Sequence, residues 1–184
     1  MDSVFLATAF ATLFVVIDPI GLTPLFVALT QGMEARARRA IGFRACLVAF
    51  GILALFGLFG EAVLGFVGIR MPAFRIAGGV LLFLTALDML SDPSIFPLGM
   101  PLIAGPGAIA TMILLTGQQP GVAGYLWAVA VMASVLCIVF VLFLLAGPIE
   151  RALGRTGTNI VTRLLGMLLA ALAVQFVVDG LLAF

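Results

Sequence analysis

Two polar interruptions in otherwise apolar sequence hold the residues that could bind a small polar molecule. The first is the stretch 18–24, Asp-Pro-Ile-Gly-Leu-Thr-Pro, which lies between the apolar runs 4–17 and 25–29. Its two prolines remove backbone donors, Gly21 relaxes the backbone and Asp18 carries a charge. In lipid these groups would have no water to bond. We therefore expect them to face a hydrated cavity lined by protein.

The second interruption is the stretch 104–111, Ala-Gly-Pro-Gly-Ala-Ile-Ala-Thr, in which Pro106 follows Pro19 by 87 residues. Broken helices at matching places in two halves of a membrane protein are the best sequence indication of a transporter's binding site. The predicted substrate-binding residues are therefore those of the two interruptions: Asp18, Pro19, Gly21, Thr23, Gly105, Pro106, Gly107 and Thr111.

The chemistry of Asp18 has two compatible interpretations. Its carboxylate could contact a substrate ammonium, bind a coupling cation or exchange a proton, because an acid retained inside a membrane is usually functional. It could also simply cap the helix that begins at Pro19.

The second interruption also leaves alternatives open. Gly105-Pro106-Gly107 could only kink a helix, although a kink needs one proline and no flanking glycines. A helix restarted there would direct free amides at an anion such as a carboxylate. Leucine at the two glycines should then fill the space that a substrate needs. The hydroxyls of Thr23 and Thr111 could bond a substrate or their own backbone.

The composition identifies the class of protein that must position these residues. The chain has 184 residues, of which 64% are hydrophobic and only 9% charged. A soluble domain so poor in charge could not cover its surface, so we expect a polytopic, all-α membrane protein. The net charge of +1 gives no indication of a nucleic-acid partner. The chain has no histidine, and Cys46 and Cys137 lie in apolar stretches, so we expect no enzyme activity, no metal site and no cofactor.

The apolar pattern predicts six membrane spans in a single transmembrane domain, residues 1–184. The expected spans are residues 4–30, 40–59, 72–90, 96–116, 122–145 and 158–182. The first and fourth are the broken ones. We predict that residues 1–90 and 96–184 are two repeats of three helices each. Because three is odd, the second repeat must be inserted upside down relative to the first.

A second pair of matching motifs supports the repeat. Arg75-Ile76-Ala77-Gly78 has a counterpart, Arg163-Leu164-Leu165-Gly166, displaced by 88 residues. The glycines of these motifs, Gly78, Gly79 and Gly166, are expected to allow close packing of helices.

The arginines predict the orientation in the membrane. Seven lie in or beside the first and fifth loops, and two lie on the other face: Arg36, Arg38, Arg39, Arg44, Arg151, Arg155 and Arg163, against Arg70 and Arg75. Cytoplasmic loops are enriched in arginine and lysine. We therefore expect both termini outside a cytoplasmic (inner) membrane.

At these residues the sequence resembles the MarC family of integral membrane proteins, which includes SnatA-like neutral amino acid transporters. The resemblance rests on three motifs and covers essentially the whole chain: residues 18–24, residues 75–90 and residues 96–109. It implies six spans, an inner-membrane location and transport of small neutral amino acids such as glycine and alanine. The linker 91–95 is shorter than the charged linker usual in the family.

The leading hypothesis is a secondary transporter, importer or exporter, of small neutral amino acids by alternating access. Its partners would be a small zwitterionic substrate, the lipid bilayer and a coupling ion, either proton or sodium. The alternatives are a small-solute channel and a non-transporting membrane scaffold or assembly partner. The sequence leaves the direction of transport, the coupling ion and the oligomeric state open.

Overall fold

The chain folds into helices throughout the part that the structure, a computed structural model, describes: residues 3–30, 32–90, 103–119 and 121–184. The helices are α1 (Ser3–Ile17), α2 (Pro19–Leu29), α3 (Ala35–Val67), α4 (Met71–Leu90), α5 (Pro106–Gln118), α6 (Val122–Leu144) and α7 (Ala146–Leu182). No strand occurs in these ranges, so the predicted all-α class is confirmed for them.

Five helical segments of the described chain are long and apolar enough to cross a membrane. They are Val4–Val27, which joins α1 and α2, Ala35–Val67, Met71–Leu90, Val122–Leu144 and Asn159–Leu182. The helix Gly107–Gln118 is apolar but shorter. It corresponds to the second half of the predicted fourth span, whose first part, 96–102, lies outside the described residues. The protein is thus a polytopic helical membrane protein.

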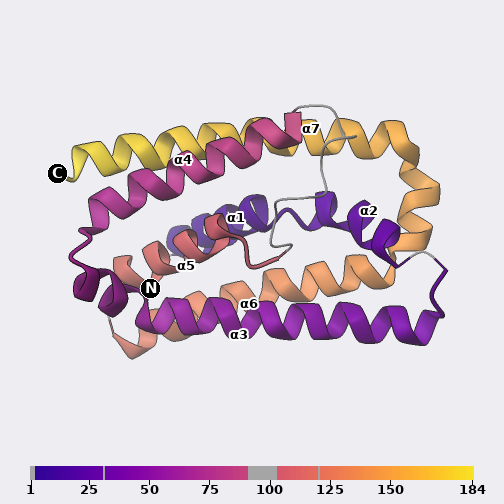
Figure 1. The fold of residues 1–184 in the computed structure, drawn as a ribbon, viewed down its shortest axis with the longest axis horizontal. Helices are drawn as coiled ribbons and strands as arrows, with labels where there is room; N and C mark the ends of the chain where they lie inside the picture. Colours follow the sequence, from indigo (N-terminus) through magenta and orange to yellow (C-terminus); the bar gives the residue numbers. More distant parts are fainter. Residues whose placement is uncertain (1–2, 31, 91–102, 120) are drawn as a thin grey trace.

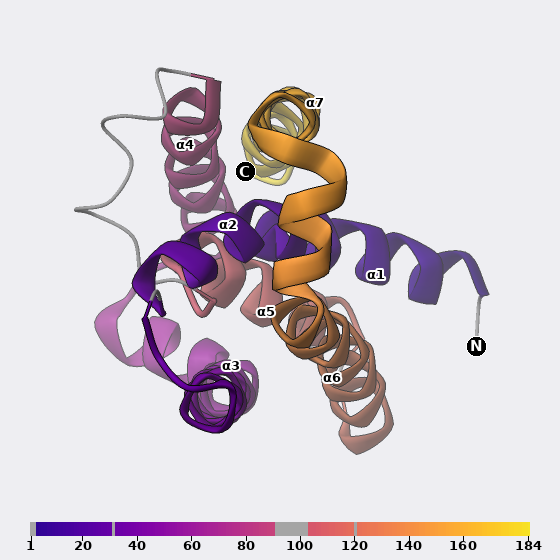
Figure 2. The ribbon, with the colours of Figure 1, turned by 90° about the vertical axis from the view of Figure 1, so that its right-hand side faces the viewer.

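The helices form three layers (Figures 1 and 2). α4 and α7 lie side by side as one pair, and α3 and α6 lie on the opposite side of the molecule. α1, α2 and α5 lie between the two pairs. In Figure 1, α2 and α5 both begin near the middle of the molecule and run toward opposite ends. The two interrupted segments are therefore central, and the uninterrupted helices surround them.

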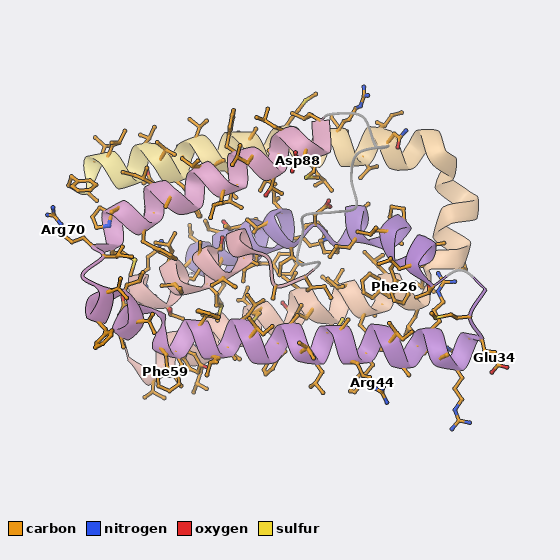
Figure 3. All side chains as sticks on the ribbon, in the orientation of Figure 1. Phe26, Glu34, Arg44, Phe59, Arg70 and Asp88 are labelled. Carbon is orange, nitrogen blue, oxygen red and sulfur yellow. The ribbon has the colours of Figure 1, made fainter. Side chains whose placement is uncertain are left out.

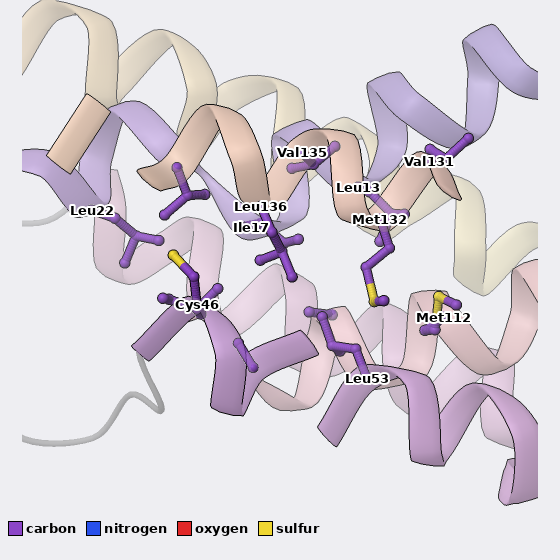
Figure 4. Close-up of a cluster of buried hydrophobic side chains, with 14 of the residues drawn as sticks. Leu13, Ile17, Leu22, Cys46, Leu53, Met112, Val131, Met132, Val135 and Leu136 are labelled. Atoms are coloured by element: carbon purple, nitrogen blue, oxygen red, sulfur yellow. The ribbon is translucent and has the colours of Figure 1, made fainter. Parts of the chain in front are cut away.

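Burial of apolar side chains holds the layers together. The larger cluster joins α1, α2, α3, α5 and α6, and its centre contains the fully buried residues Leu13, Leu53, Met112 and Met132 (Figure 4). A smaller cluster joins α4 and α7 around Leu82 and Leu169. Outside these clusters large apolar side chains point away from the protein (Figure 3), as a lipid-facing surface requires.

Glycines bring α4 and α7 into close contact. A Cβ at Gly79 would lie 2.7 Å from the carbonyl oxygen of Ala173. A Cβ at Gly166 would lie 3.1 Å from Cβ of Met89, and one at Gly78 would lie 3.0 Å from Cβ of Ala110 on α5. The three glycines singled out in the sequence therefore lie at helix contacts, where small residues let backbones approach.

Two predicted helix boundaries were wrong. The predicted span 40–59 is part of a longer helix, because α3 continues to Val67 and ends at Gly68, which adopts a φ of 80°. The predicted sixth span begins at residue 158, whereas α7 already begins at Ala146. Pro148 is tolerated there because first-turn amides need no intrahelical acceptor. The predicted end of the fifth span at residue 145 agrees with α6, which ends at Leu144.

Candidate functional site

The first interruption is a break of a single residue. α1 ends at Ile17, α2 begins at Pro19, and Asp18 between them adopts φ 51° and ψ 65°. It is the one non-glycine residue of the described chain with a positive φ. Such a left-handed conformation is uncommon outside glycine, and asparagine and aspartate tolerate it best. The prediction that the break extends to Pro24 was wrong, because Pro24 lies within α2.

Asp18 caps α2. Its Oδ1 atom accepts a hydrogen bond of 3.0 Å from the amide of Gly21, which would otherwise lack an intrahelical acceptor. A Cβ at Gly21 would collide with the carboxylate of Asp18. Only glycine at position 21 therefore lets the Asp18 carboxylate approach the backbone this closely. The capping interpretation of Asp18 is confirmed, and this geometry does not test a further role of its charge.

Thr23 is buried and uses its hydroxyl locally. The hydroxyl donates a hydrogen bond of 2.9 Å to the carbonyl oxygen of Pro19, and the side chain is 3% exposed. The oxygen can still accept a hydrogen bond, but its proton is engaged by its own helix. Pro19 itself is fully buried at the first position of α2.

The second interruption starts α5 without a side-chain cap. Gly105 is the N-cap residue, with extended backbone at φ −69° and ψ 166°, and Pro106 follows at the start of the helix. The amide of Ile109 bonds the carbonyl oxygen of Gly105 at 3.0 Å. Glycine offers no capping oxygen and Pro106 has no amide hydrogen. The amides of Gly107 and Ala108 therefore receive no side-chain cap of the kind that Asp18 gives to α2.

The structure brings the two interruptions together. The position of a Cβ at Gly107 lies 3.5 Å from Cγ1 of Val16, which is two residues before Asp18. The same position would collide with the side chain of Leu82 from α4. In this conformation the side chain of Leu82 therefore occupies the volume beside Gly107 in which the sequence predicts a substrate. Leu82 is 1% exposed, so the contact is well inside the protein.

Thr111 carries a buried hydroxyl with no hydrogen-bond partner. The residue lies on α5, one turn beyond Gly107, and is 0% exposed. Thr116 on the same helix instead donates to the carbonyl oxygens of Met112 and Ile113, at 3.1 and 3.0 Å. Buried hydroxyls are nearly always bonded, so an unbonded one indicates a missing partner.

The electrostatic field at this site comes from the N-termini of two helices and from one acidic side chain. The positive ends of α2 and α5 both lie near the middle of the molecule (Figure 1). The helices α1, α2 and α5 contain no acidic residue, and Asp18, between α1 and α2, lies beside the start of α2 only. No group of three or more potential metal ligands occurs among the described residues.

Sequence reasoning missed two residues of the site. Val16 and Leu82 separate the two interruptions, and both belong to apolar helices that contain many similar residues. No local signal distinguishes them, because their importance comes from which helices lie next to each other.

Comparison with known sequences agrees with this architecture. A family described as "MarC family integral membrane protein" matches residues 3–94 and 90–184. A "UPF0056 membrane protein" of Archaeoglobus fulgidus is 38% identical over 196 residues, covering 96% of this chain and 92% of its own. No solved structure matches the chain.

Bacterial relatives are similar over nearly their full length. "UPF0056 membrane protein YvbG" of Bacillus subtilis is 35% identical, covering 96% of this chain and 94% of its own. "UPF0056 inner membrane protein YhgN" of Escherichia coli K12 is 34% identical, covering 95% of this chain and 94% of its own.

Proposed function

The chain belongs to the MarC family of integral membrane proteins, and on this premise we propose that it is a secondary transporter of small neutral amino acids such as glycine and alanine. It would act in the cytoplasmic membrane, where the Escherichia coli relative, named as an inner membrane protein, is located. The role is transport without chemical conversion of the substrate, driven by a proton or sodium gradient.

An inverted repeat underlies the proposal. α2 begins at Pro19 and α5 at Pro106, α3 begins at Ala35 and α6 at Val122, and each pair is 87 residues apart. α2 contacts α6 and α7, while α5 contacts α3 and α4. If α2, α3 and α4 correspond to α5, α6 and α7, the contacts of α2 with α6 and α7 correspond to those of α5 with α3 and α4. Together with the predicted count of six spans, this pattern supports two three-helix repeats of opposite orientation.

The observation that carries the proposal is the meeting of two helix starts that differ in their caps. The start of α2 is capped by Asp18, and the start of α5, beside Val16, has no side-chain cap. A substrate carboxylate would take the amides of Gly107 and Ala108, as anions do at helix N-termini. The substrate ammonium would lie toward Asp18.

Two further residues of the site fit this arrangement. The unbonded hydroxyl of Thr111 would donate to or accept from the substrate. Leu82 would have to move, because its side chain fills the volume beside Gly107. We therefore infer that Leu82 closes the site in this conformation, and that movement of α4 relative to α5 is part of alternating access.

The test is uptake into proteoliposomes that contain the purified protein. Labelled glycine and alanine are compared with leucine, glutamate and lysine, with and without preloaded unlabelled substrate, under imposed proton or sodium gradients. We expect saturable uptake of glycine and alanine, acceleration by preloading, and little uptake of the charged amino acids. Flux that does not saturate and shows no counterflow would favour a channel, and no flux of any of these solutes would contradict the proposal.

A further inference from the structure

A second polar site lies near the start of α3, away from the two interruptions. Cζ of Arg38 lies 5.5 Å from the ring centroid of Phe26 on α2. That ring stacks on Phe143 of α6, with centroids 4.0 Å apart and planes inclined by 7°. A Cβ at Gly42 would lie 3.3 Å from Phe26 and 3.4 Å from Phe143. Arg38 therefore lies at the junction of α2, α3 and α6.

The guanidinium of Arg38 is covered on its recognition edge and has no partner there. Its Nε and Nη2 atoms are buried, and neither makes a hydrogen bond. The acid nearest in sequence, Glu34, is exposed and gives no such bond (Figure 3). Stacking on an aromatic ring supports the charge but leaves the N–H donors unsatisfied. Arg38 as a whole is partly exposed, but its two buried N–H groups lack an acceptor, and leaving buried donors unbonded is costly.

The geometry of the two unpaired atoms indicates which chemical group could bind them. Nε–H and Nη2–H lie on one edge of the guanidinium plane and point in the same direction, which is the geometry that receives two oxygens of a carboxylate or phosphate. The surroundings are positive as well. Arg36 and Arg39 lie within the first two turns of α3, whose N-terminus adds its own positive field.

We propose that Arg38 binds an oxyanion, a phosphate or carboxylate group, through its Nε and Nη2 atoms at the junction of α2, α3 and α6. Two sources supply such a group at this end of the molecule. One is the headgroup phosphate of an anionic phospholipid, and the other is the carboxylate of a small free solute. The proposal does not depend on transport, because an oxyanion can stabilise this junction in a protein of any membrane function.

The experiment measures thermal unfolding of the purified protein in a neutral detergent. Phosphatidylglycerol, phosphatidylcholine and sodium acetate are titrated separately, with sodium chloride to hold ionic strength constant. The variants are Arg38→Gln, Arg38→Lys and, as a matched control, Arg44→Gln. Arg44 is an exposed arginine on the same helix that points away from the bundle (Figure 3).

We expect phosphatidylglycerol or acetate to raise the unfolding temperature of the unmodified protein and of Arg44→Gln, with phosphatidylcholine inert. Arg38→Gln should raise the half-saturating concentration about tenfold or more, as loss of a charged hydrogen-bonded pair predicts. The half-saturating concentration of Arg38→Lys should lie between those of the unmodified protein and Arg38→Gln, because lysine keeps the charge but lacks the two parallel N–H donors of arginine. A response to phosphatidylglycerol alone assigns the lipid phosphate, and a response to acetate assigns a free carboxylate.

Two results would overturn the proposal. One is that neither phosphatidylglycerol nor acetate changes the unfolding temperature of the unmodified protein, a result that does not depend on any variant being folded. The other is an equal shift in Arg38→Gln and Arg44→Gln, which would place the effect on surface charge in general.

Discussion

The carboxylate of Asp18 and the backbone of Gly21 are fitted to each other: Oδ1 accepts the Gly21 amide at 3.0 Å, and the carboxylate occupies the volume that a side chain at position 21 would need. One non-helical residue therefore serves to end α1, start α2 and hold a carboxylate in the middle of an apolar layer. The backbone of Asp18 also joins the two helices, because its amide donates to the carbonyl oxygen of Phe14 and its carbonyl oxygen accepts from the amide of Leu22, both at 3.0 Å.

Gly21→Ala should destabilise the protein by about 1–3 kcal/mol, because the new Cβ must displace the Asp18 carboxylate and weaken the cap. The measurement is chemical or thermal unfolding in detergent. Gly51→Ala is the matched control, since nothing lies within 4 Å of its added Cβ and alanine favours a helix. Equal effects of the two substitutions would contradict the fitted cap.

Substitution of Asp18 separates capping from charge. Asp18→Asn keeps a capping oxygen and tolerates the left-handed backbone, so its stability should lie within about 0.5 kcal/mol of the unmodified protein. Asp18→Ala should lose about 1–3 kcal/mol through the cap and the strained backbone. If the charge meets a substrate ammonium or a coupling ion, Asp18→Asn abolishes concentrative uptake in proteoliposomes. Uptake by Asp18→Asn at the unmodified rate would leave Asp18 as a cap alone.

Thr111→Val should reduce substrate affinity without loss of stability. Valine has the same shape and removes a buried hydroxyl that has no partner, so unfolding should be unchanged or require a higher temperature. The half-saturating concentration for uptake should rise by about 2- to 12-fold, equivalent to one neutral hydrogen bond. Thr116→Val is the control, because that hydroxyl bonds its own helix. Unchanged affinity in Thr111→Val would remove Thr111 from the site.

Gly107→Ala and Leu82→Ala should be coupled. Gly107→Ala overpacks against Leu82 and should cost about 1–3 kcal/mol. Leu82→Ala leaves a cavity and should cost about 2–5 kcal/mol. In the double variant the alanine of one residue enters space vacated by the other, so the combined cost should be smaller than the sum by at least about 0.5 kcal/mol. Additive costs would show that α4 does not lie against the start of α5.

The orientation can be checked with single cysteines labelled by a membrane-impermeant maleimide. Met33→Cys lies between α2 and α3, and Gln118→Cys lies at the end of α5, at the opposite end of the molecule. We expect labelling of Gln118→Cys in intact cells and of Met33→Cys only after permeabilisation. The unmodified protein, with Cys46 and Cys137 in apolar helices, controls for background. The reverse pattern would place both termini in the cytoplasm.

The positions of the two interruptions were predictable because their signals are local. Pro19 and Pro106 each have one fixed place at a helix start, and Asp before proline is a capping arrangement that depends on neighbours in sequence. The class of protein was predictable for a similar reason, since so few charges cannot cover a soluble surface.

The contents of the site were less predictable because they depend on distant packing. Nothing in the sequence around Gly107 indicates that Leu82 occupies its open side, and nothing around Arg38 indicates a stack of Phe26 on Phe143. Two helix boundaries were mispredicted because an apolar helix extends further than its local sequence indicates. α3 continues beyond Phe59 to Val67, and α7 begins at Ala146 with Pro148 in its first turn.

The length of α3 has a consequence for the membrane itself. Its 33 residues span about 50 Å at 1.5 Å per residue, whereas the hydrocarbon layer is about 30 Å thick. The helix must therefore tilt or project into the headgroup region, and its angle will follow bilayer thickness. Arg38 lies at the projecting start of this helix and stacks on α2. Lipids of different chain length should therefore change the contact between α3 and α2, and through it the position of the helix that Asp18 caps.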